Sequence, residues 1–453
     1  MPQRLNKYQR LLDLPWSPNP ITGSAAAFLW GPRQSGKTTL LHQRFPEARF
    51  YDLLDTTLSA ELSVTPRLLR EQILAARPPV VVVDEIQKVP ALLEEVHWLL
   101  ENTATRFVLC GSSARALRRR ARNLLGGRAV EHHLLPLTSR EIPDLDLERY
   151  FHHGGLPAHY LADDPTPRLK AYVNAYIREE IINESATRNV PAFARFLQVV
   201  ALTHAQRINY ANIARETGVS PSTVRSYFQI LDDTLLGYTL EPWRKSARRR
   251  LVETAKYYLF DVGVARALHP EAAVVTEGSD LYGRAFEHFL LNEVRAYLAY
   301  HRDDRPLTFW RTHSGFEVDL IVGDLEAAIE FKSGRHIRDA DFRGLRALKE
   351  EHRVGRTIIV ARTDEPRTTD DGIEIRPGGC SARSSGTGRL SEARPPEALP
   401  APRQAGPSLL RKNPQDSLLH SGSSVRRHGG TSCGDGSSAR GSTRGRGAET
   451  VRG

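Results

Sequence analysis

The first third of the chain alternates short apolar runs with stretches of helical spacing. The apolar runs predict five strands, at residues 25–30, 49–53, 79–85, 106–110 and 129–135. Continuous apolar runs are typical of strands covered on both faces, and strands that alternate with helices pair in parallel through right-handed crossovers. The pattern therefore predicts an α/β fold that begins with a parallel sheet over residues 21–140, after an N-terminal segment of residues 1–20.

Helical spacing dominates the part that follows. Apolar residues recur at helical intervals in residues 169–177, which read LKAYVNAYI. Residues 141–195 are therefore expected to be helical, either as a lid over the preceding core or as a linker to the next unit.

A helix-turn-helix is predicted within residues 208–231. The spacing that packs two helices across a tight turn is carried by Ala214, Gly218 and Val224. Ser220 can cap the second helix and Pro221 can start it. The unit 196–243 is thus expected to be winged-helix-like. Its second helix offers one basic side chain, Arg225, so contact with DNA and packing against protein are both open alternatives.

Residues 244–376 return to strand patterns. Two strands are predicted, at 317–322 and 327–332, joined by a short turn. Any even loop length keeps Asp319 and Glu330 on one sheet face, because side chains alternate along a strand. Depending on the turn, the two carboxylates lie directly opposite or diagonal to each other.

The same sheet face carries a possible metal chemistry. Lys332 joins Asp319 and Glu330 by alternation, and two carboxylates with an ammonium can bind Mg²⁺ and orient a water. A predicted helix upstream, residues 282–300, carries Glu287 at the border of its apolar arc. The alternative is a hairpin with a structural ion pair between glutamate and lysine.

A phosphate-binding loop stands between the first strand and the first helix. Residues 31–38 read GPRQSGKT, which is the pattern G-x-x-x-x-G-K-T. Glycines let backbone N–H groups point at phosphate oxygens, Lys37 can reach the β- and γ-phosphates, and the Thr38 hydroxyl can hold Mg²⁺. The residues predicted to bind nucleotide are Gly31, Pro32, Arg33, Gln34, Ser35, Gly36, Lys37, Thr38, Thr39, Asp84 and Ser112.

Residues at the ends of later strands complete this predicted site. Asp84 would hold Mg²⁺ directly or through water, and Glu85 would polarise the attacking water as a general base. Ser112 is either a sensor of the γ-phosphate or part of an ordinary turn. Arg128 follows a glycine pair and is either an arginine finger or a surface residue.

Composition narrows the class of protein. The chain has 453 residues, enough for two or three domains, and three cysteines, Cys110, Cys380 and Cys433, that lack metal-binding spacing. These features, with no apolar run of 18 residues and no signal-like N-terminus, lead us to expect a cytoplasmic protein that does not span a membrane.

The net charge of +10 is concentrated at the C-terminus. Residues 377–453 hold 12 Lys+Arg against 5 Asp+Glu, so +7 of the charge lies there and only +3 remains for residues 1–376. Global charge therefore says little about DNA binding. That tail is rich in Gly, Ser, Arg and Pro and is expected to be disordered, either as a genuine basic tail or as a frameshift product.

Taken together, residues 20–376 resemble a family of prokaryotic AAA+-type P-loop ATPases with a conserved C-terminal domain of unknown function. The matching segments are WGPRQSGKTTL, VVVDEIQKVP, LCGSSARAL, LLGGRAVEHHLLPLT, YYLFDVGVARAL, YGRAFEHFLLNEVRAY and FEVDLIVGDLEAAIEFKSG. The resemblance implies a PD-(D/E)XK restriction-endonuclease-like fold for the C-terminal unit, with a site made of Glu287, Asp319, Glu330 and Lys332. A last helix or strand expected after Ile375 is missing.

These observations predict a Mg²⁺-dependent ATPase that couples nucleotide state to a winged-helix and nuclease-like module. ATP and Mg²⁺ are the expected cofactors, and DNA and further copies of the chain are candidate partners. The catalytic residues would be Glu85, Arg128 and Lys332, and the metal ligands Thr38, Asp84, Glu287, Asp319 and Glu330. The rival functions are an ATP-driven regulatory switch with an inactive nuclease-like domain and an ATP-gated nuclease.

Overall fold

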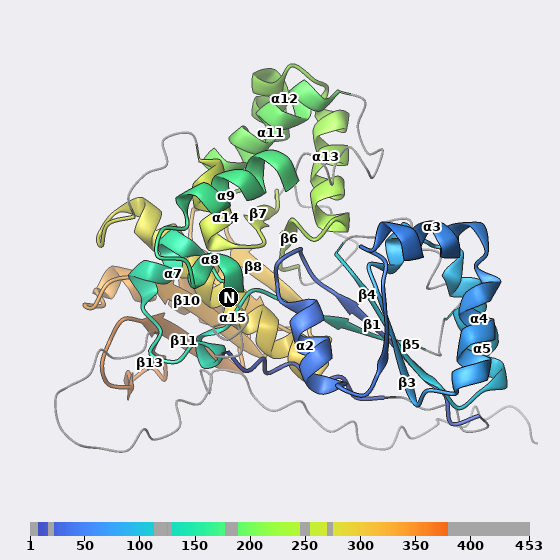
Figure 1. Ribbon diagram of the computed structural model, residues 1–453. Helices are drawn as coiled ribbons and strands as arrows, with labels where there is room; N and C mark the ends of the chain where they lie inside the picture. Colours follow the sequence, from blue (N-terminus) through green and yellow to red (C-terminus); the bar gives the residue numbers. More distant parts are fainter. Residues whose placement is uncertain are drawn as a thin grey trace, which may run out of the picture. The chain divides into compact units, whose positions relative to one another are not determined.

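The computed structural model describes residues 8–16, 22–112, 125, 129–176, 189–244, 254–269 and 275–378 (Figure 1). All of them belong to one compact unit, Met1–Pro402. Arg128 and the tail beyond residue 378 lie outside the described residues.

The N-terminal part is built on the predicted parallel sheet. Its strands are β1 (Ala25–Trp30), β2 (Arg49–Asp52), β3 (Val80–Asp84), β4 (Arg106–Gly111) and β5 (Ala129–His133). They lie in the order β2-β3-β4-β1-β5, and every adjacent pair is parallel. The predicted α/β fold class is confirmed, and each predicted strand matches its observed counterpart within two residues at either end.

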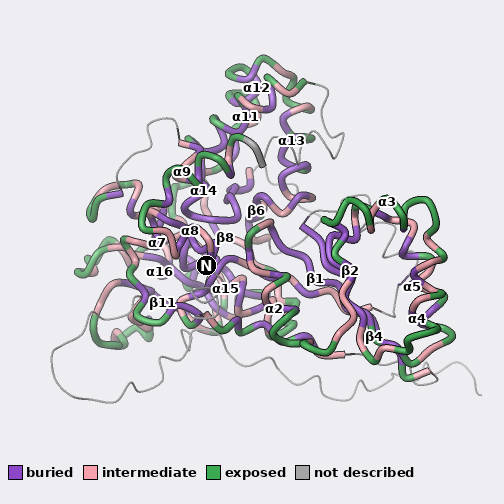
Figure 2. The backbone as a smooth tube through the Cα atoms, viewed as in Figure 1, coloured by how far each residue is buried: buried purple, intermediate pink, exposed green. Residues whose placement is uncertain are grey.

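Helices cover both faces of this sheet. They are α2 (Lys37–Arg44), α3 (Thr56–Val64), α4 (Arg67–Ala76) and α5 (Leu92–Asn102), and Figure 1 shows α4 and α5 on one side and α2 on the other. Alternate residues of the strands divide between the two faces: Val82 packs with Leu41 of α2, whereas Val83 packs with Val96 of α5. Exposed residues gather on α3 and α4 (Figure 2).

Helix α5 illustrates what holds these layers together. Five of its eleven residues are buried apolar side chains, Leu92, Leu93, Val96, Leu99 and Leu100. Their spacing forms one apolar face, and burying a side chain of this kind stabilises the fold by about 1.5–3 kcal/mol. The whole face therefore anchors α5 firmly on the sheet.

The middle of the chain is helical, as predicted. Its elements are η2 (Ser139–Glu141), α7 (Leu147–His153), α8 (Pro157–Tyr160), α9 (Thr166–Ala171), η3 (Tyr172–Tyr176), α11 (Val190–Leu202), α12 (Tyr210–Thr217) and α13 (Pro221–Asp233). The turn between α12 and α13 depends on Gly218, whose φ of 71° favours glycine. Ser220 caps α13 by accepting a hydrogen bond from the Thr223 backbone N–H at 3.1 Å. The two predicted helices are thus present, and the winged-helix assignment stays a prediction.

The C-terminal part contains a second, mixed sheet of eight strands. The strands are β6 (Gly237–Pro242), β7 (Lys256–Leu259), β8 (Leu307–Arg311), β9 (Glu317–Val322), β10 (Ala327–Lys332), β11 (Arg356–Ala361), β12 (Arg367–Thr368) and β13 (Glu374–Pro377), in the order β12-β13-β11-β10-β9-β8-β6-β7. Around them lie α14 (Val262–Leu268), α15 (Asp280–His301), η4 (Asp339–Phe342) and α16 (Arg343–Glu351). Because β6 pairs with β8 as well as with β7, this sheet crosses the boundary that we predicted between residues 243 and 244.

The register of β9 and β10 decides between the two predicted arrangements. Ala327 lies opposite Val322 and Ile329 lies opposite Leu320. Continuing this antiparallel register by one residue places Glu330 directly opposite Asp319. The two strands begin and end at the residues predicted for them.

The C-terminal limit of the described fold lies slightly beyond residue 376. Strand β13 runs to Pro377 and pairs in parallel with β11. The Gly378 backbone N–H then donates to the Ala361 carbonyl at 2.7 Å. The strand that contains Ile375 therefore continues for two residues beyond it, and a truncation should keep residues up to 378.

Deleting residues 379–453 is expected to leave the melting temperature and nucleotide binding nearly unchanged. The deleted sequence lacks the apolar periodicity needed to offset an ordering cost of about 1–2 kcal/mol per residue. The matched control deletes residues 374–453, which removes β13 and its fully buried Ile375. Loss of one such core side chain costs about 2–5 kcal/mol, so only the control should melt earlier by circular dichroism. An equal loss in both truncations would show that the tail packs on the fold.

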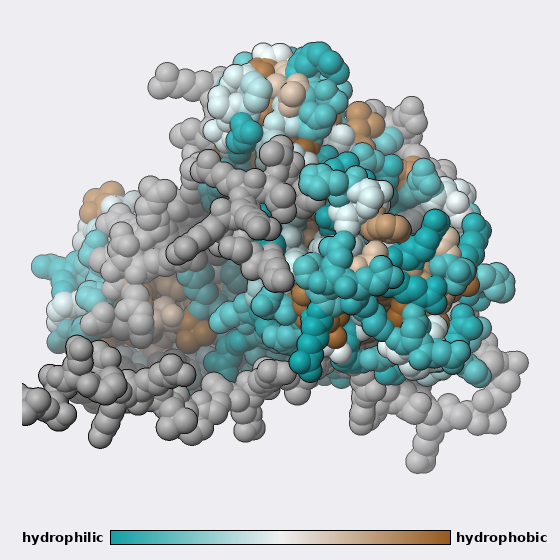
Figure 3. Space-filling model, turned by 180° about the vertical axis from the view of Figure 1, so that it is seen from behind, coloured by the Kyte–Doolittle hydropathy of each residue, from teal (hydrophilic) through white to brown (hydrophobic). Residues whose placement is uncertain are grey.

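Hydrophilic side chains predominate on the described surface in Figure 3, between scattered hydrophobic ones. No helix among the residues that the structure describes is long and apolar enough to cross a membrane.

Candidate functional site

The phosphate loop connects β1 to α2, as the sequence predicts. Gly36 precedes α2 with a φ of 92°, a conformation that strains any residue with a side chain. Gly31 lies against Leu134, the residue after β5, where an added Cβ would stand 2.6 Å from the Leu134 carbonyl oxygen. Glycine is therefore required at both ends of the loop, which curls so that the N-terminus of α2 faces its inside.

Two side chains of the loop are hydrogen-bond donors placed where they can bind an anion. Lys37 is buried, and its ammonium donates to the carbonyls of Gly31 at 2.8 Å and Pro32 at 3.0 Å. The Ser35 hydroxyl is fully buried and has no hydrogen-bond partner among the described residues. Within the described part of the chain, the ammonium is bonded to carbonyls and the hydroxyl is unpaired, and both groups fit the phosphates of a nucleotide.

The predicted magnesium ligands meet across the sheet edge. Thr38 lies in the first turn of α2, and Asp84 ends β3. The Thr38 hydroxyl donates to Asp84 Oδ2 at 2.5 Å. A hydroxyl and a carboxylate at this distance provide the hard oxygen ligands that Mg²⁺ prefers, so these residues fit the ion that the loop motif implies.

Glu85 lies next to this pair in an uncommon backbone conformation. Its φ of 56° is in the left-handed region, which costs a residue other than glycine about 1–3 kcal/mol and clusters at active sites. Its carboxylate accepts hydrogen bonds from the Gln87 amide and, at 3.3 Å, from the Ser112 hydroxyl. Gln87 also donates to the Ser112 hydroxyl at 3.3 Å. Glu85 is thereby held at the ends of β3 and β4, close to Asp84.

Gln87 is a residue that our sequence analysis missed. It stands two residues after Glu85 in the one-turn helix η1 (Ile86–Lys88), so its proximity could have been inferred from the sequence. The roles predicted for Glu85 as general base and for Ser112 as sensor stay predictions. Arg128 lies outside the described residues.

Arg10 is a second missed residue, and it reaches the loop from the N-terminal segment. It is buried, and its guanidinium donates to the Ser35 carbonyl at 3.2 Å and to the Tyr300 hydroxyl at 2.9 Å. It also forms an ion pair at 3.0 Å with Glu141, whose side chain is fully buried. Arg10 therefore connects the backbone of the phosphate loop to helix α15.

A further contact joins η2, the short helix after β5, to helix α15. The Ser139 backbone N–H and hydroxyl donate to the two carboxylate oxygens of Glu293, at 2.8 and 2.7 Å. Helix α15 carries Glu287, Glu293 and Tyr300 on its 22 residues. From Glu287 to Tyr300 it spans about 20 Å at 1.5 Å per residue. One rigid element thus joins the surroundings of the phosphate loop to the carboxylates of the second sheet.

The predicted C-terminal site contains an additional cation, Lys256, at the start of β7. Its ammonium lies 2.6 Å from Glu317 Oε1, 3.3 Å from Glu287 Oε1 and 3.8 Å from Asp319 Oδ1. Burial lowers the pKa of Lys256, but the surrounding carboxylates raise it above its usual value. Lys256 is therefore a charged, buried ammonium among acidic groups. The sequence signal was a lone lysine in front of an apolar strand.

The other half of this cluster consists of Glu330 and Lys332 on β10. The Lys332 ammonium lies 2.6 Å from Glu330 Oε1, whereas Glu330 Oε2 is buried without a hydrogen-bond partner among the described residues. Burial and the nearby Asp319 carboxylate raise the pKa of Glu330 to about 8, against the opposing effect of Lys332. Asp319 Oδ2 accepts from the Phe331 backbone N–H at 2.9 Å.

The structure brings the four predicted residues Glu287, Asp319, Glu330 and Lys332 into one cluster. Within the described ranges, however, no three or more His, Cys, Asp or Glu side chains are arranged so that they could hold a metal ion. The Mg²⁺ site predicted there stays a prediction, and the structure adds Lys256 as a competitor for its position.

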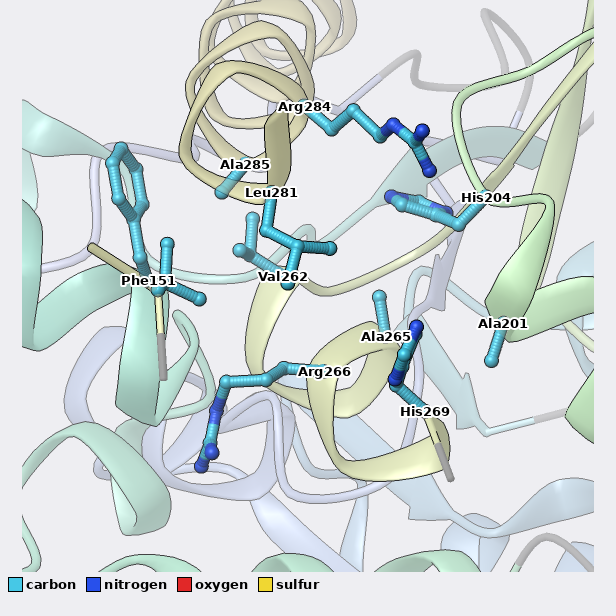
Figure 4. A pocket seen from close by; sticks show the side chains of 11 residues that line it. Phe151, Ala201, His204, Val262, Ala265, Arg266, His269, Leu281, Arg284 and Ala285 are labelled. Atoms are coloured by element: carbon cyan, nitrogen blue, oxygen red, sulfur yellow. The ribbon is translucent and has the colours of Figure 1, made fainter. Parts of the chain in front are cut away.

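A separate pocket lies among α7, α11, α14 and α15 (Figure 4). Phe151, Val262 and Leu281 contribute to its apolar lining, and the side chains of Arg284 and His204 point toward each other at one side. Burial and the charge of Arg284 lower the pKa of His204 to about 3, so this histidine is neutral. None of the predicted site residues lines this pocket.

Three protein families match successive parts of the chain. Residues 24–143 match the family described as an AAA domain. Residues 144–274 and 282–379 match two families described as domains of unknown function, DUF8612 and DUF4143. With the parallel sheet and the phosphate loop, the first match shows that the N-terminal part is a P-loop domain of AAA type.

Relatives along most of the chain are themselves uncharacterized proteins. One from Mycobacterium tuberculosis and one from Mycobacterium bovis are each 27% identical over 343 residues, which is 73% of this chain and 75% of the relative.

Two solved structures resemble parts of the fold. One is the Aeropyrum pernix ORC1 protein in complex with DNA, which is 14% identical in sequence. The match covers 54% of this chain and 86% of the ORC1 chain, with a TM-score of 0.25. The other is a signal transduction ATPase with a tetratricopeptide repeat sensor from Pyrococcus horikoshii, which is 16% identical in sequence. The match covers 62% of this chain and 46% of that protein, with a TM-score of 0.19. Neither superposition is close enough to bear on function.

Proposed function

We propose that this chain is a Mg²⁺-dependent ATP hydrolase whose nucleotide state is transmitted to its C-terminal part. The observation that carries the proposal is the 2.5 Å hydrogen bond from Thr38 to Asp84 beside the buried Lys37. Lys37 and the loop N–H groups would hold the phosphates, and Thr38 with Asp84 would hold Mg²⁺. A Mg²⁺ ion held there would neutralise charge on the phosphate oxygens.

The chain's own groups then account for the hydrolytic step. Glu85 is held by Gln87 and Ser112 so that its carboxylate can accept a proton from the attacking water. Ser112 shares this network and would report the presence of the γ-phosphate to Glu85. Arg128 is proposed as the arginine that stabilises charge during transfer.

Transmission to the C-terminal part would start at Arg10. Its guanidinium holds a carbonyl inside the phosphate loop and a hydroxyl on α15 at the same time. When Lys37 exchanges its bonds to Gly31 and Pro32 for phosphates, the loop backbone is free to shift. Arg10 would carry that shift to α15, and any effect on the C-terminal cluster must act back on ATP affinity.

In the first form of this proposal, the C-terminal part is restriction-endonuclease-like and acts on DNA with the winged-helix-like region. The support is the D-x(10)-E-x-K pattern on paired strands, with Asp319 opposite Glu330. In the second form, the chain is an ATP-driven regulatory switch whose nuclease-like domain does not cut. The ammonium of Lys256 within the carboxylate cluster favours this second form.

ATP hydrolysis by the full-length protein, measured with and without DNA, tests the proposal. Hydrolysis that requires Mg²⁺ supports the ATPase, and stimulation by DNA supports the first form. The same samples should be assayed for cleavage of plasmid DNA, with Asp319→Ala as the comparison. Hydrolysis without either DNA effect supports the switch, and absence of ATP binding contradicts both forms.

Replacing Arg10 by alanine is expected to destabilise the protein by about 3–5 kcal/mol. The substitution leaves Glu141 as a fully buried carboxylate without its partner, which is the costly way to break a buried ion pair. The matched control is Arg44→Ala, since Arg44 is exposed and surface substitutions usually change stability by about 0.5 kcal/mol or less. Urea denaturation followed by tryptophan fluorescence measures both. An equally small change in the two variants would contradict the anchoring role of Arg10.

A further inference from the structure

Lys256 occupies the position in the C-terminal cluster where a metal ion would be expected. It begins β7, a strand whose four residues are all buried, and its side chain is 6% exposed. The strand is held by antiparallel pairing with β6, in which Lys256 lies opposite Leu240. The pairing of β7 with β6 thus fixes the position of the Lys256 ammonium, and its carboxylate partners lie on other elements of the fold.

Three carboxylates from two elements converge on this ammonium. Glu287 comes from α15, and Glu317 and Asp319 come from β9. All three have an oxygen within 3.8 Å of the Lys256 nitrogen. Tyr258, two residues along β7, donates its hydroxyl to Glu287 Oε1 at 2.5 Å and fixes the carboxylate toward Lys256.

The charges of the cluster are already nearly balanced without a metal. Among the residues that the structure describes, the cluster has four carboxylates, Glu287, Glu317, Asp319 and Glu330, and three cations, Lys256, Arg311 and Lys332. Four carboxylates therefore face three cations, which leaves an excess of only one negative charge. A divalent ion placed among the same oxygens would stand next to a buried ammonium, and like charges at that separation repel strongly.

We infer that Lys256 is a built-in cation that holds Glu287, Glu317 and Asp319 together and excludes divalent metals from the cluster. Metal binding and the observed position of Lys256 are mutually exclusive. A metal can enter only after the ammonium leaves. The apparent affinity for the metal therefore equals its intrinsic affinity multiplied by the fraction of molecules in which Lys256 has left. This inference is independent of whether the phosphate loop hydrolyses ATP.

Binding of Mn²⁺ to the nucleotide-free, full-length protein tests the inference. Wild type and Lys256→Met are titrated with Mn²⁺ alone and free Mn²⁺ is followed by electron paramagnetic resonance. Each of the two proteins is compared with a variant of itself that also carries Asp319→Asn. The difference between them removes the contribution of Mn²⁺ bound elsewhere in the chain. We expect no binding that depends on Asp319 in wild type, and one such site in Lys256→Met. The gain in apparent affinity should be about 100-fold or more if about 1% of wild-type molecules are competent.

A second variant keeps the test decisive should Lys256→Met fail to fold. Lys256→Met combined with Glu317→Gln removes one cation and one anion, so the net charge of the cluster is unchanged. It retains Glu287, Asp319 and Glu330 as ligands and should also gain one Mn²⁺ site. Mn²⁺ should raise the melting temperature of this variant but not that of wild type. Binding to wild type that depends on Asp319, or no gained site in any folded Lys256 variant, would overturn the inference.

Discussion

Replacing Lys37 by alanine is expected to weaken ATP binding by about 150-fold, equivalent to about 3 kcal/mol. The buried Lys37 ammonium donates to the carbonyls of Gly31 and Pro32 within the phosphate loop. Without it, the negative charge of the β- and γ-phosphates would be matched only by backbone N–H groups. Isothermal titration calorimetry with ATP and Mg²⁺ measures the change directly.

The matched control for this prediction is Lys88→Ala. Lys88 is exposed at the end of η1, three residues after Glu85, and it does not belong to the phosphate loop. Its removal changes net charge equally and should leave ATP affinity unchanged. Wild-type affinity in Lys37→Ala, with a normal melting temperature, would contradict the assignment of the nucleotide site.

The variant Glu85→Gln is expected to bind ATP normally and to lower kcat by about 10²–10⁴-fold. This range is typical for loss of a general base, and the amide keeps the size of the carboxylate while losing its basicity. Because Gln87 and Ser112 already position the Glu85 side chain, the substitution should leave the backbone in place. A phosphate-release assay with saturating ATP provides the measurement.

A comparison at the same sheet edge separates this effect from general loss of charge. Glu94→Gln removes an exposed carboxylate from the first turn of α5 and should hydrolyse ATP at the wild-type rate. Should Glu85→Gln also turn over normally, another group must accept the proton and Glu85 would be left with a structural role beside Gln87.

The strands were predictable from the sequence because their signals are local. The strands 317–322 and 327–332 agree with the structure residue for residue, since alternation and a short turn define both ends. The relative register of Asp319 and Glu330 was not predictable in the same way. Two turns of even length keep the same side chains on the same face, and only the pairing of Ala327 with Val322 distinguishes them.

The residues that sequence analysis missed make contacts between distant parts of the chain. Arg10 bonds to groups 25, 125 and 290 residues away. Lys256 meets carboxylates 31 to 63 residues away, on helix α15 and on strand β9, and β6 and β8 lie between β7 and β9 in the sheet. Neither position lies in a motif, and a single sequence contains no signal for such long-range pairs. Gln87, by contrast, was within reach, because a one-turn helix brings it back to Glu85.

The pairing of β6 with β8 has a consequence for folding during synthesis. β6 ends at Pro242 and β8 begins at Leu307, so 64 residues lie between the end of one strand and the start of the other. At about 5–20 residues per second, a ribosome takes about 3–13 s to deliver the second strand. During that interval β6 and β7 present an unpaired strand edge, which is a template for association with other chains. The nascent chain therefore exposes this edge to aggregation after the helix-turn-helix has emerged and before β8 has, and a chaperone would protect the edge during that interval.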